Sequence, residues 1–292
     1  MAIPYEEGSI LYEKNLKTRV GWIIFNRPEK YNAMTMAMYE RVRDLVWQSE
    51  QDDDVKVIGF KGNGKAFCSG QDVDDAYSFY FKEGDDPGRR PSMRRRLLTL
   101  DGTLWGKHGL TEVITYCLKP TVAMIQHRCF GSGLDILMAC DIAVASDDTL
   151  FGHPGFTYHG FGGDIGSYIL HLGIKRTKRF TLTSRPFDAK KAYDWGMVNE
   201  IVPMADLVKT TNEVIDDLTR MPFDALVMQK AYYRTVLDAM GLGTNLSAAL
   251  QTLAFASNIR YEPGENVMVR DRKKGGGASA AIKTRKQFYG HL

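Results

Sequence analysis

The sequence lacks the features that mark membrane, secreted and disulfide-stapled proteins. It contains no run of about 18 apolar residues, so no segment is expected to cross a membrane. Its polar, acidic start, Met1 to Gly8, has no hydrophobic stretch of the kind found in signal peptides. The chain has only 4 cysteines and no CxxC pair, which predicts reduced thiols in a cytoplasmic protein.

The charge of the chain is also unremarkable in sign and size. Lys and Arg number 38 and Asp and Glu 35, which leaves a net charge of +3, too small to predict a nucleic-acid binder. With 44% hydrophobic and 25% charged residues, the composition is that of a globular protein and excludes a disordered chain. A length of 292 residues predicts two domains, or one large α/β unit with an appendage.

Strand and helix patterns alternate through the first two thirds of the chain. The predicted strands are 10–12, 20–25, 55–61, 121–127 and 142–145, and the predicted helices are 34–49 and 133–139. A glycine-containing turn is expected between residues 127 and 133. This recurrence predicts an α/β fold in which helices pack outside a wound sheet.

The pattern becomes helical after Pro203, with predicted helices at 207–220, 224–240, 245–259 and a basic one at about 279–288. We therefore expect a core of residues 1–203 and a C-terminal helical region of residues 204–292. The core carries a polar insertion at about 77–110, which is either a functional loop or a solvated surface segment.

Two glycine-containing turns are the strongest local signals. The first, 64–72 (GKAFCSGQD), follows a strand, and the second, 128–135 (RCFGSGLD), leads into a helix. Small residues let the backbone turn tightly, and the first peptide N–H groups of a helix have no partner within the helix. If the two turns face each other, they would form an oxyanion hole that stabilises charge developing on a carbonyl oxygen. The second turn lacks the third glycine of a dinucleotide-binding fingerprint.

Several segments together carry a family resemblance. They are Asn26-Arg27-Pro28, Asn32-Ala33-Met34, 66–72, Gly131-Ser132-Gly133, Cys140-Asp141-Ile142-Ala143, 151–154, 160–163, 189–199, 201–203 and 270–275. In this order the chain resembles the crotonase superfamily, which contains the enoyl-CoA hydratases and isomerases. The resemblance covers nearly the whole chain, and only the segment from about 77 to 110 has no clear counterpart.

The resemblance implies a crotonase-like spiral of ββα units with a C-terminal helical trimerisation region. It also implies a homotrimer or hexamer that acts on an acyl-CoA thioester and needs no separate cofactor, because coenzyme A enters with the substrate. The oxyanion-hole amides would be those of Gln71 and Ser132. Further substrate contacts would come from the residues around them, namely Ala66, Ser69, Gly70, Asp72, Val73 and Gly131.

The carboxylates depart from the family pattern. Hydratases of this family use two glutamates, which here would fall at Asp135 and at Gly155, and glycine has no side chain. The nearest replacement is Asp164, as a general base or nucleophile, with Asp135 holding water or a proton. Either aspartate could instead have a structural role, Asp135 in the first turn of its helix and Asp164 as the N-cap of a helix starting near Ile165.

Other polar residues are assigned more simply. Tyr158 and His159 would hydrogen-bond a polar or cyclic acyl group, or lie exposed in their loop, and His153 is expected to be structural. The remaining cations would bind coenzyme A phosphates: Arg27 and Lys30 within one subunit, and Lys283 and Lys286 from its neighbour. The spacing of His108, His127 and His171 predicts no metal site.

The sequence thus favours an enoyl-CoA hydratase/isomerase type of enzyme, acting on something other than a plain short-chain enoyl-CoA. A second interpretation is hydrolysis or C–C cleavage of a cyclic β-keto acyl-CoA. A third, from another class, is a catalytically silent scaffold that binds coenzyme A. Neither a nucleic acid nor a membrane is expected as a partner.

Overall fold

The computed structural model describes residues 5–80, 97–98, 100–104, 106, 108–158, 163–256 and 265. The predicted basic helix at 279–288 lies outside these residues, as do His159, Lys283, Lys286 and most of the insertion. No described helix is both long enough and apolar enough to span a bilayer.

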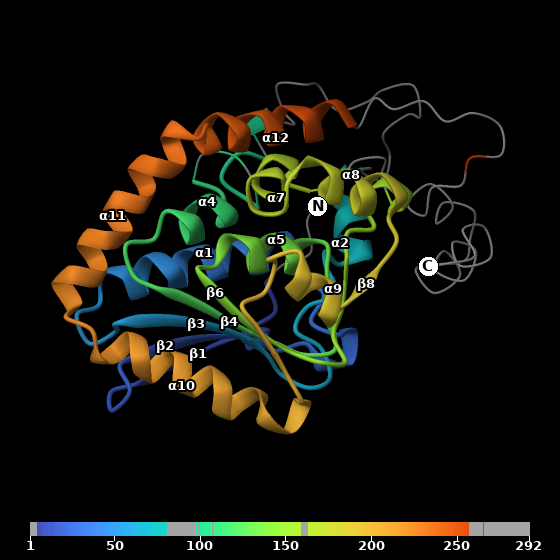
Figure 1. Ribbon diagram of the computed structural model, residues 1–292. Coiled ribbons are helices and arrows are strands. Elements are labelled where there is room, and N and C mark those ends of the chain that lie inside the picture. The colour runs from blue at the N-terminus through green and yellow to red at the C-terminus, as the bar shows by residue number, and fades with distance from the viewer. Residues whose placement is uncertain are drawn as a thin grey trace.

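A six-stranded sheet forms the centre of the described part of the chain (Figure 1). Its strands, in spatial order, are β1 (Ile10–Asn15), β2 (Val20–Phe25), β3 (Val57–Gly62), β4 (Thr121–Ile125), β6 (Ile142–Ser146) and β9 (Glu200–Val202). Only the β1–β2 pair is antiparallel, and every later pair is parallel. The predicted strands therefore exist close to their expected positions.

A second, three-stranded sheet was not predicted. It consists of β5 (Arg128–Phe130), β7 (Leu150–Gly152) and β8 (Phe187–Asp188), with β5 and β7 parallel. The prediction of a turn throughout 128–132 was thus wrong for its first residues. Strands of two or three residues are too short to show an alternating pattern, and they form here because a neighbouring strand satisfies their backbone.

Helices cover both faces of the larger sheet, as Figure 1 shows. One face carries α1 (Met36–Gln51), α4 (Leu110–Thr115) and α5 (Ser132–Ala139), and the other carries α10 (Leu207–Arg220). From α10 the chain continues into α11 (Phe223–Ala239), which runs along one side to α12 (Leu242–Ala256), and α12 packs on α7 (Ile165–Leu172). The remaining elements are η1 (Pro28–Lys30), α2 (Val73–Tyr80), α6 (Gly155–Tyr158), α8 (Ile174–Thr183), α9 (Ala189–Asp194) and η2 (Met204–Asp206).

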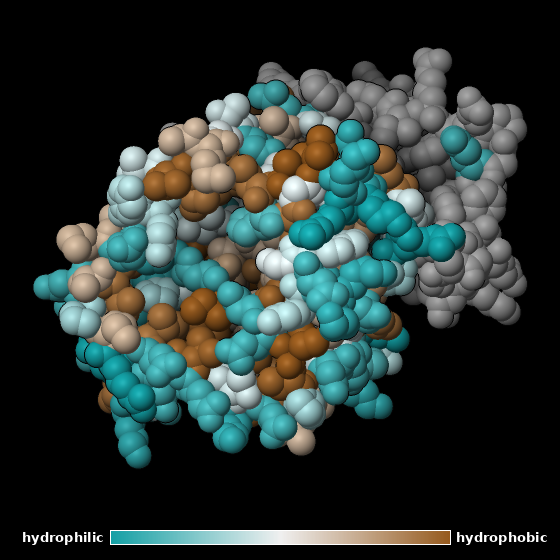
Figure 2. Space-filling view, viewed as in Figure 1, coloured by the Kyte–Doolittle hydropathy of each residue, from teal (hydrophilic) through white to brown (hydrophobic). Residues whose placement is uncertain are grey.

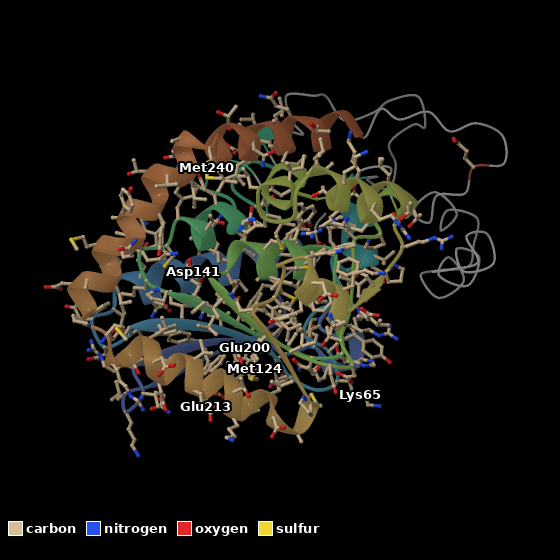
Figure 3. The ribbon with its side chains drawn as sticks, viewed as in Figure 1. Lys65, Met124, Asp141, Glu200, Glu213 and Met240 are labelled. Atoms are coloured by element: carbon tan, nitrogen blue, oxygen red, sulfur yellow. The ribbon has the colours of Figure 1, made fainter. Side chains whose placement is uncertain are left out.

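Three polar side chains hold the loops at the strand ends. Asn32, fully buried at φ 56°, donates to the carbonyls of Asn63 (2.9 Å) and Ala66 (2.7 Å). Asp141, labelled in Figure 3, accepts from the Thr121 amide at 2.8 Å and from Lys230 of α11 at 2.5 Å. The Asn199 side chain accepts from the Ala143 amide at 2.8 Å. These contacts explain why asparagine or aspartate stands at three of the sequence segments noted above.

The surface of the described residues mixes polar and apolar side chains, and the face in Figure 2 shows apolar patches between polar ones. Helix α11 in particular leaves large apolar side chains exposed, which are Met228, Tyr232, Tyr233 and Val236. An apolar helix face of this kind is typical of a contact with another protein surface.

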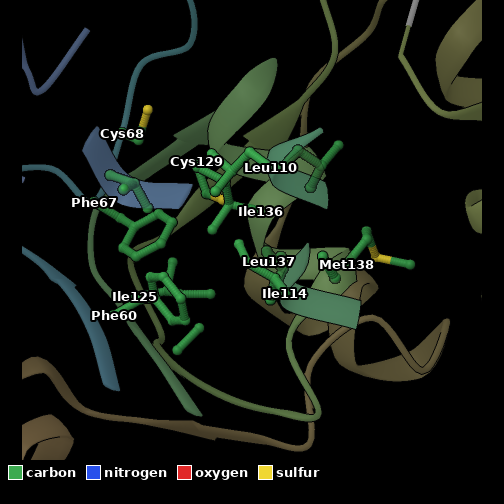
Figure 4. Packing of buried hydrophobic residues seen from close by; sticks show 14 of the residues in the cluster. Phe60, Phe67, Cys68, Leu110, Ile114, Ile125, Cys129, Ile136, Leu137 and Met138 are labelled. Carbon is green, nitrogen blue, oxygen red and sulfur yellow. The ribbon is translucent and has the colours of Figure 1, made fainter. Parts of the chain in front are cut away.

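The core lies between the larger sheet and the helices α1, α4 and α5. Phe67, which lies in the first half of the first glycine turn, is fully buried, and its ring meets Phe25 edge-on at a centroid distance of 5.1 Å. Figure 4 shows Phe67 beside Phe60 and Ile125, with Ile136 of α5 nearby. The first glycine turn is therefore anchored to the core at its start.

Because truncation of Phe67 would leave a cavity at this anchor, Phe67→Ala should lower the free energy of unfolding by about 3–5 kcal/mol. Urea denaturation followed by circular dichroism measures this change. Leu182→Ala is the control, because Leu182 is 63% exposed and its loss should change stability by no more than about 0.5 kcal/mol. Equal effects of the two substitutions would contradict the assignment of Phe67 to the core.

Candidate active site

The two glycine turns meet in space. Gly70 (φ 102°) and Gly131 (φ 53°) both have backbone angles that favour glycine. A Cβ atom on Gly70 would lie 3.1 Å from the Phe130 carbonyl oxygen, and one on Gly131 would lie 3.4 Å from the Gly70 Cα. The Phe130 amide donates to the Cys68 carbonyl at 3.0 Å, which joins the two turns. The expected face-to-face arrangement is thus present.

The peptide N–H groups of Gln71 in the first turn and of Ser132 in the second have no acceptor in the described part of the protein. Gln71 lies opposite Met34 in a parallel bridge. The two hydrogen bonds of this bridge are made by the residues on either side of Gln71, the Gly70 carbonyl and the Asp72 amide. The N–H of Gln71 itself therefore points away from Met34. Ser132 is the first residue of α5, where the N–H has no partner within the helix. Among the described residues, neither amide has an acceptor.

The side chains around these amides are structural. The Ser132 hydroxyl accepts a hydrogen bond from the Tyr39 hydroxyl at 2.9 Å. A Cβ on Gly133 would lie 2.7 Å from the Cβ of Cys68, so α5 packs directly on the first turn. Burial raises the pKa of the Cys68 thiol to about 12, which keeps it neutral and rules it out as a thiolate nucleophile.

Asp135 lies in the first turn of α5, three residues after Ser132, and its side chain is fully buried. The Tyr168 hydroxyl donates a hydrogen bond to its Oδ1 atom. Its Oδ2 atom is buried and has no hydrogen-bond partner in the described part of the chain, while the Nε2 atom of His153 lies 3.7 Å away. Sequence reasoning missed Tyr168, because its position within an apolar helix predicts only core packing.

Asp164 is the N-cap of α7, and its Oδ1 atom accepts from the Ser167 amide at 3.2 Å and from the Asn245 side chain of α12. The expected N-cap position of Asp164 is thus present, and α7 starts at Ile165 as expected, whereas a catalytic role of Asp164 stays a prediction. Burial raises the pKa of Asp164, and the charge of Asp135 raises it further, against the effect of the two donors. Asn245 was not predicted, because nothing in the sequence of α12 distinguishes it.

Gly163 brings the two aspartates into one region. At φ 72° it favours glycine, and a Cβ there would lie 2.7 Å from the Tyr168 hydroxyl, 2.9 Å from His153 Nε2 and 3.0 Å from Asp135 Oδ1. The bend that leads into Asp164 therefore packs on the group formed by Asp135, Tyr168 and His153. Two free peptide donors and two shielded carboxylates can polarise a carbonyl group and move a proton beside it.

The predicted phosphate-binding cations are partly engaged within the protein. Arg27 is buried and donates to Asp72 at 3.0 Å, and Lys30 lies 3.3 Å from the same carboxylate. Asp72 also accepts from the Asp74 amide at 2.9 Å. The Lys30 side chain remains 48% exposed, so it has more freedom than Arg27 to meet a ligand. Binding of coenzyme A by either residue stays a prediction.

The other predicted substrate contacts lie in the first turn, directly after it, or in α6. Ser69 donates from its hydroxyl to the Lys30 carbonyl at 3.3 Å, and Val73 begins α2. Gly155 begins α6 and donates its amide to His153 Nδ1 at 3.2 Å, and Tyr158 ends that helix. In the described residues, no three His, Cys, Asp or Glu side chains gather as they would around a metal ion.

Comparison with known proteins identifies the family. A model of the enoyl-CoA hydratase/isomerase family matches residues 15–258. The chain belongs to this family. It is therefore a member of the crotonase superfamily, and the α/β spiral with C-terminal helices is confirmed.

One curated relative and two solved structures are also similar to the chain. The chain is 30% identical over 201 residues to the hydroxycinnamoyl-CoA hydratase-lyase of Pseudomonas fluorescens, covering 68% of this chain and 69% of that protein. An enoyl-CoA hydratase from Mycobacterium smegmatis superposes with a TM-score of 0.80 at 26% identity, over 97% of this chain and 94% of the other. An enoyl-CoA hydratase/isomerase from Xanthobacter autotrophicus Py2 gives a TM-score of 0.77 at 25% identity, over 97% and 98%.

Asp164 offers a test of stability and its pH dependence. Asp164→Ala removes the cap of α7 and should lower the free energy of unfolding by about 1 kcal/mol. Asp164→Asn keeps a capping oxygen and removes a buried charge, so it should be at least as stable as the wild type at neutral pH. The pKa of Asp164 is higher in the folded state than in the unfolded state. The wild type therefore loses stability as the pH rises from the unfolded-state pKa to the folded-state pKa of Asp164.

The stability advantage of Asp164→Asn over the wild type should therefore grow from acid to neutral pH. Urea denaturation of both proteins across that range measures it. An advantage that does not change with pH would contradict the raised pKa.

Proposed function

We propose that the chain is an enzyme that processes acyl-CoA thioesters by stabilising a thioester enolate. The thioester oxygen accepts hydrogen bonds from the amides of Gln71 and Ser132, and α5 adds the positive end of its dipole. The observation that supports this proposal is the contact between Gly70 and Gly131, the residues directly before Gln71 and Ser132, whose amides have no acceptor among the described residues. Membership of the enoyl-CoA hydratase/isomerase family supports it.

In the proposed reaction, the two amides stabilise negative charge on the thioester oxygen, and the carbon next to the carbonyl becomes acidic. When that carbon is saturated, as in a 3-enoyl thioester, Asp164 takes its proton, the C–H electron pair forms the double bond of the enolate, and the carbonyl electron pair moves onto the oxygen. A carboxylate whose pKa is raised by burial is a better base near neutrality than an exposed one. In isomerisation, Asp135 returns a proton to the γ-carbon as the double bond shifts and the thioester carbonyl forms again. In hydration of a 2-enoyl thioester no α-proton is removed, and Asp135 instead holds the water that adds to the β-carbon before the enolate is protonated at the α-carbon.

The proposed substrates are enoyl-CoA thioesters with a polar or cyclic acyl group. Gly155 provides no side chain where the family's second glutamate would fall, which disfavours simple hydration of a short enoyl-CoA. The Pseudomonas relative acts, as its name states, on hydroxycinnamoyl-CoA, which has an aromatic acyl group. In this proposal, Tyr158 and His159 contact the polar part of the acyl group.

A second candidate is hydrolysis or C–C cleavage of a cyclic β-keto acyl-CoA. The feature that favours it is the combination of a buried Asp164 with a glycine at position 155, where the family has its second glutamate. A single carboxylate can activate a water molecule or attack the substrate directly. Product analysis separates the two. Hydration or isomerisation leaves a thioester, whereas the second reaction yields a free carboxylate or an opened ring.

We further propose a cytoplasmic homotrimer or hexamer in which Lys30, together with Lys283 and Lys286 of a neighbouring copy, binds the coenzyme A phosphates. The exposed apolar face of α11 supports assembly. Binding through lysine side chains would weaken with added salt.

The role of the Ser132 amide can be tested by comparing a variant that loses the peptide N–H with a variant that loses only the side-chain hydroxyl. Ser132→Pro removes the N–H group at the first position of α5, where proline is otherwise tolerated. We expect kcat for the accepted acyl-CoA to fall about 10²–10³-fold. Ser132→Ala is the control, since it loses the hydroxyl and keeps the N–H, and it should retain most of the activity. If the two variants lose activity equally, the amide is not the catalytic donor.

The catalytic role of Asp164 is tested with a panel of crotonyl-CoA, a hydroxycinnamoyl-CoA and a cyclic β-keto acyl-CoA. We expect the wild type to convert at least one of the last two, and Asp164→Asn to lose about 10²–10⁴-fold in kcat, as expected for loss of a general base. Chromatography of the CoA products measures both. If the wild type binds the thioesters and converts none, the protein is a silent binder and the proposed function fails.

A further inference from the structure

We propose that Tyr168 and His153 are positioning residues for Asp135, and that the three form a buried proton-handling unit in place of the family's paired glutamates. The proposal rests on the proposed function, since it gives Asp135 its role in the reaction. It starts from a carboxylate that is fully shielded from water and yet has one oxygen without a hydrogen bond.

Tyr168 fixes one side of the carboxylate. Its side chain is fully buried on α7, and its hydroxyl donates to Asp135 Oδ1. Burial and the neighbouring Asp135 raise the pKa of Tyr168 well above its ordinary value, so the hydroxyl keeps its proton. The ring is held by Phe180, at a centroid distance of 5.3 Å. Tyr168 is therefore a permanent and rigid donor to one oxygen of Asp135.

His153 faces the other oxygen. Its Nδ1 atom accepts the Gly155 amide at 3.2 Å, so a neutral ring carries its proton on Nε2. Nε2 lies 3.7 Å from Asp135 Oδ2, the oxygen without a partner. That separation is too long for a hydrogen bond in this structure and short enough to close with a small rotation of the side chain. The Gly155 amide thus directs a donor toward Asp135 from the position where relatives carry a glutamate.

The surroundings leave the carboxylate few other contacts. Gly163 closes the third side, and any larger residue there would strike both Tyr168 and Asp135. The charge of Asp135 also raises the pKa of three other groups, which are the Asp164 carboxyl and the Cys68 and Cys129 thiols. Burial raises the pKa of both thiols, so they stay neutral. With Oδ1 held by Tyr168, the free Oδ2 is the oxygen that can take up or return a proton.

Tyr168→Phe tests the first contact, because it removes one hydroxyl and keeps the ring. We expect kcat on the accepted acyl-CoA to fall about 10- to 100-fold, with KM changed by less than about threefold. Tyr116→Phe is the matched control, since the Tyr116 hydroxyl also donates to an aspartate, Asp238, at 2.5 Å, on a different part of the molecule. The control should leave kcat unchanged.

A double-mutant cycle separates positioning from a purely structural role. If Tyr168 acts through Asp135, Tyr168→Phe should cause little further loss of kcat in an Asp135→Asn background. His153→Gln keeps an N–H donor and should retain more activity than His153→Leu. Circular dichroism and thermal melting establish whether each variant is folded. If Tyr168→Phe does not fold, the comparison of His153→Gln with His153→Leu still tests the proposal.

The outcomes distinguish the inference from the proposed function. Activity lost in Asp135→Asn and kept in Tyr168→Phe and His153→Leu overturns the inference and leaves the function standing. Losses in Tyr168→Phe and Asp135→Asn that simply multiply would show independent structural effects and also overturn it. A wild type that converts none of the thioesters overturns the proposed function and the inference with it.

Discussion

The close approach of Gly70 and Gly131 is the constraint on which the rest of the site depends. Each glycine stands where a side chain would meet backbone of the opposite turn, and each has a backbone angle that favours glycine. The contact is held from both sides, by Phe67 in the core and by α5 packed on Cys68 through Gly133. It leaves two peptide N–H groups facing away from their own secondary structure. Donors fixed in this way need no reorganisation when charge develops on a ligand, which is the basis of oxyanion stabilisation.

The carboxylates show a second constraint, which is burial. Asp135 and Asp164 are almost completely shielded from water, and each has its own set of donors. Two of these donors come from distant parts of the chain, Tyr168 of α7 to Asp135 and Asn245 of α12 to Asp164, whereas the Ser167 amide is a local capping donor to Asp164. Gly166 has no room for a side chain because Asn245 occupies that space. The C-terminal helices thus take part in shaping the region around the aspartates as well as covering the sheet.

Much of the fold could be predicted from the sequence, because long elements carry strong patterns. The strand Val20–Phe25 and the helix Leu207–Arg220 have the predicted bounds, and the N-cap at Asp164 follows from a simple local rule. The second sheet could not be predicted, because its strands are too short to show a period. The same holds for Tyr168 and Asn245, whose roles depend on contacts 33 and 81 residues away in sequence. The buried ion pair between Arg27 and Asp72 could not be predicted either. An arginine that follows a strand fits an exposed contact with a ligand as well as it fits a buried ion pair.

The most direct test of the account is a crystal structure of the protein with an unreactive acyl-CoA analogue bound. We expect the thioester oxygen to lie about 2.7–3.2 Å from both the Gln71 and the Ser132 amide nitrogens, with an aspartate facing the adjacent carbon. A thioester oxygen bound elsewhere, with either amide satisfied by a protein group, would contradict it.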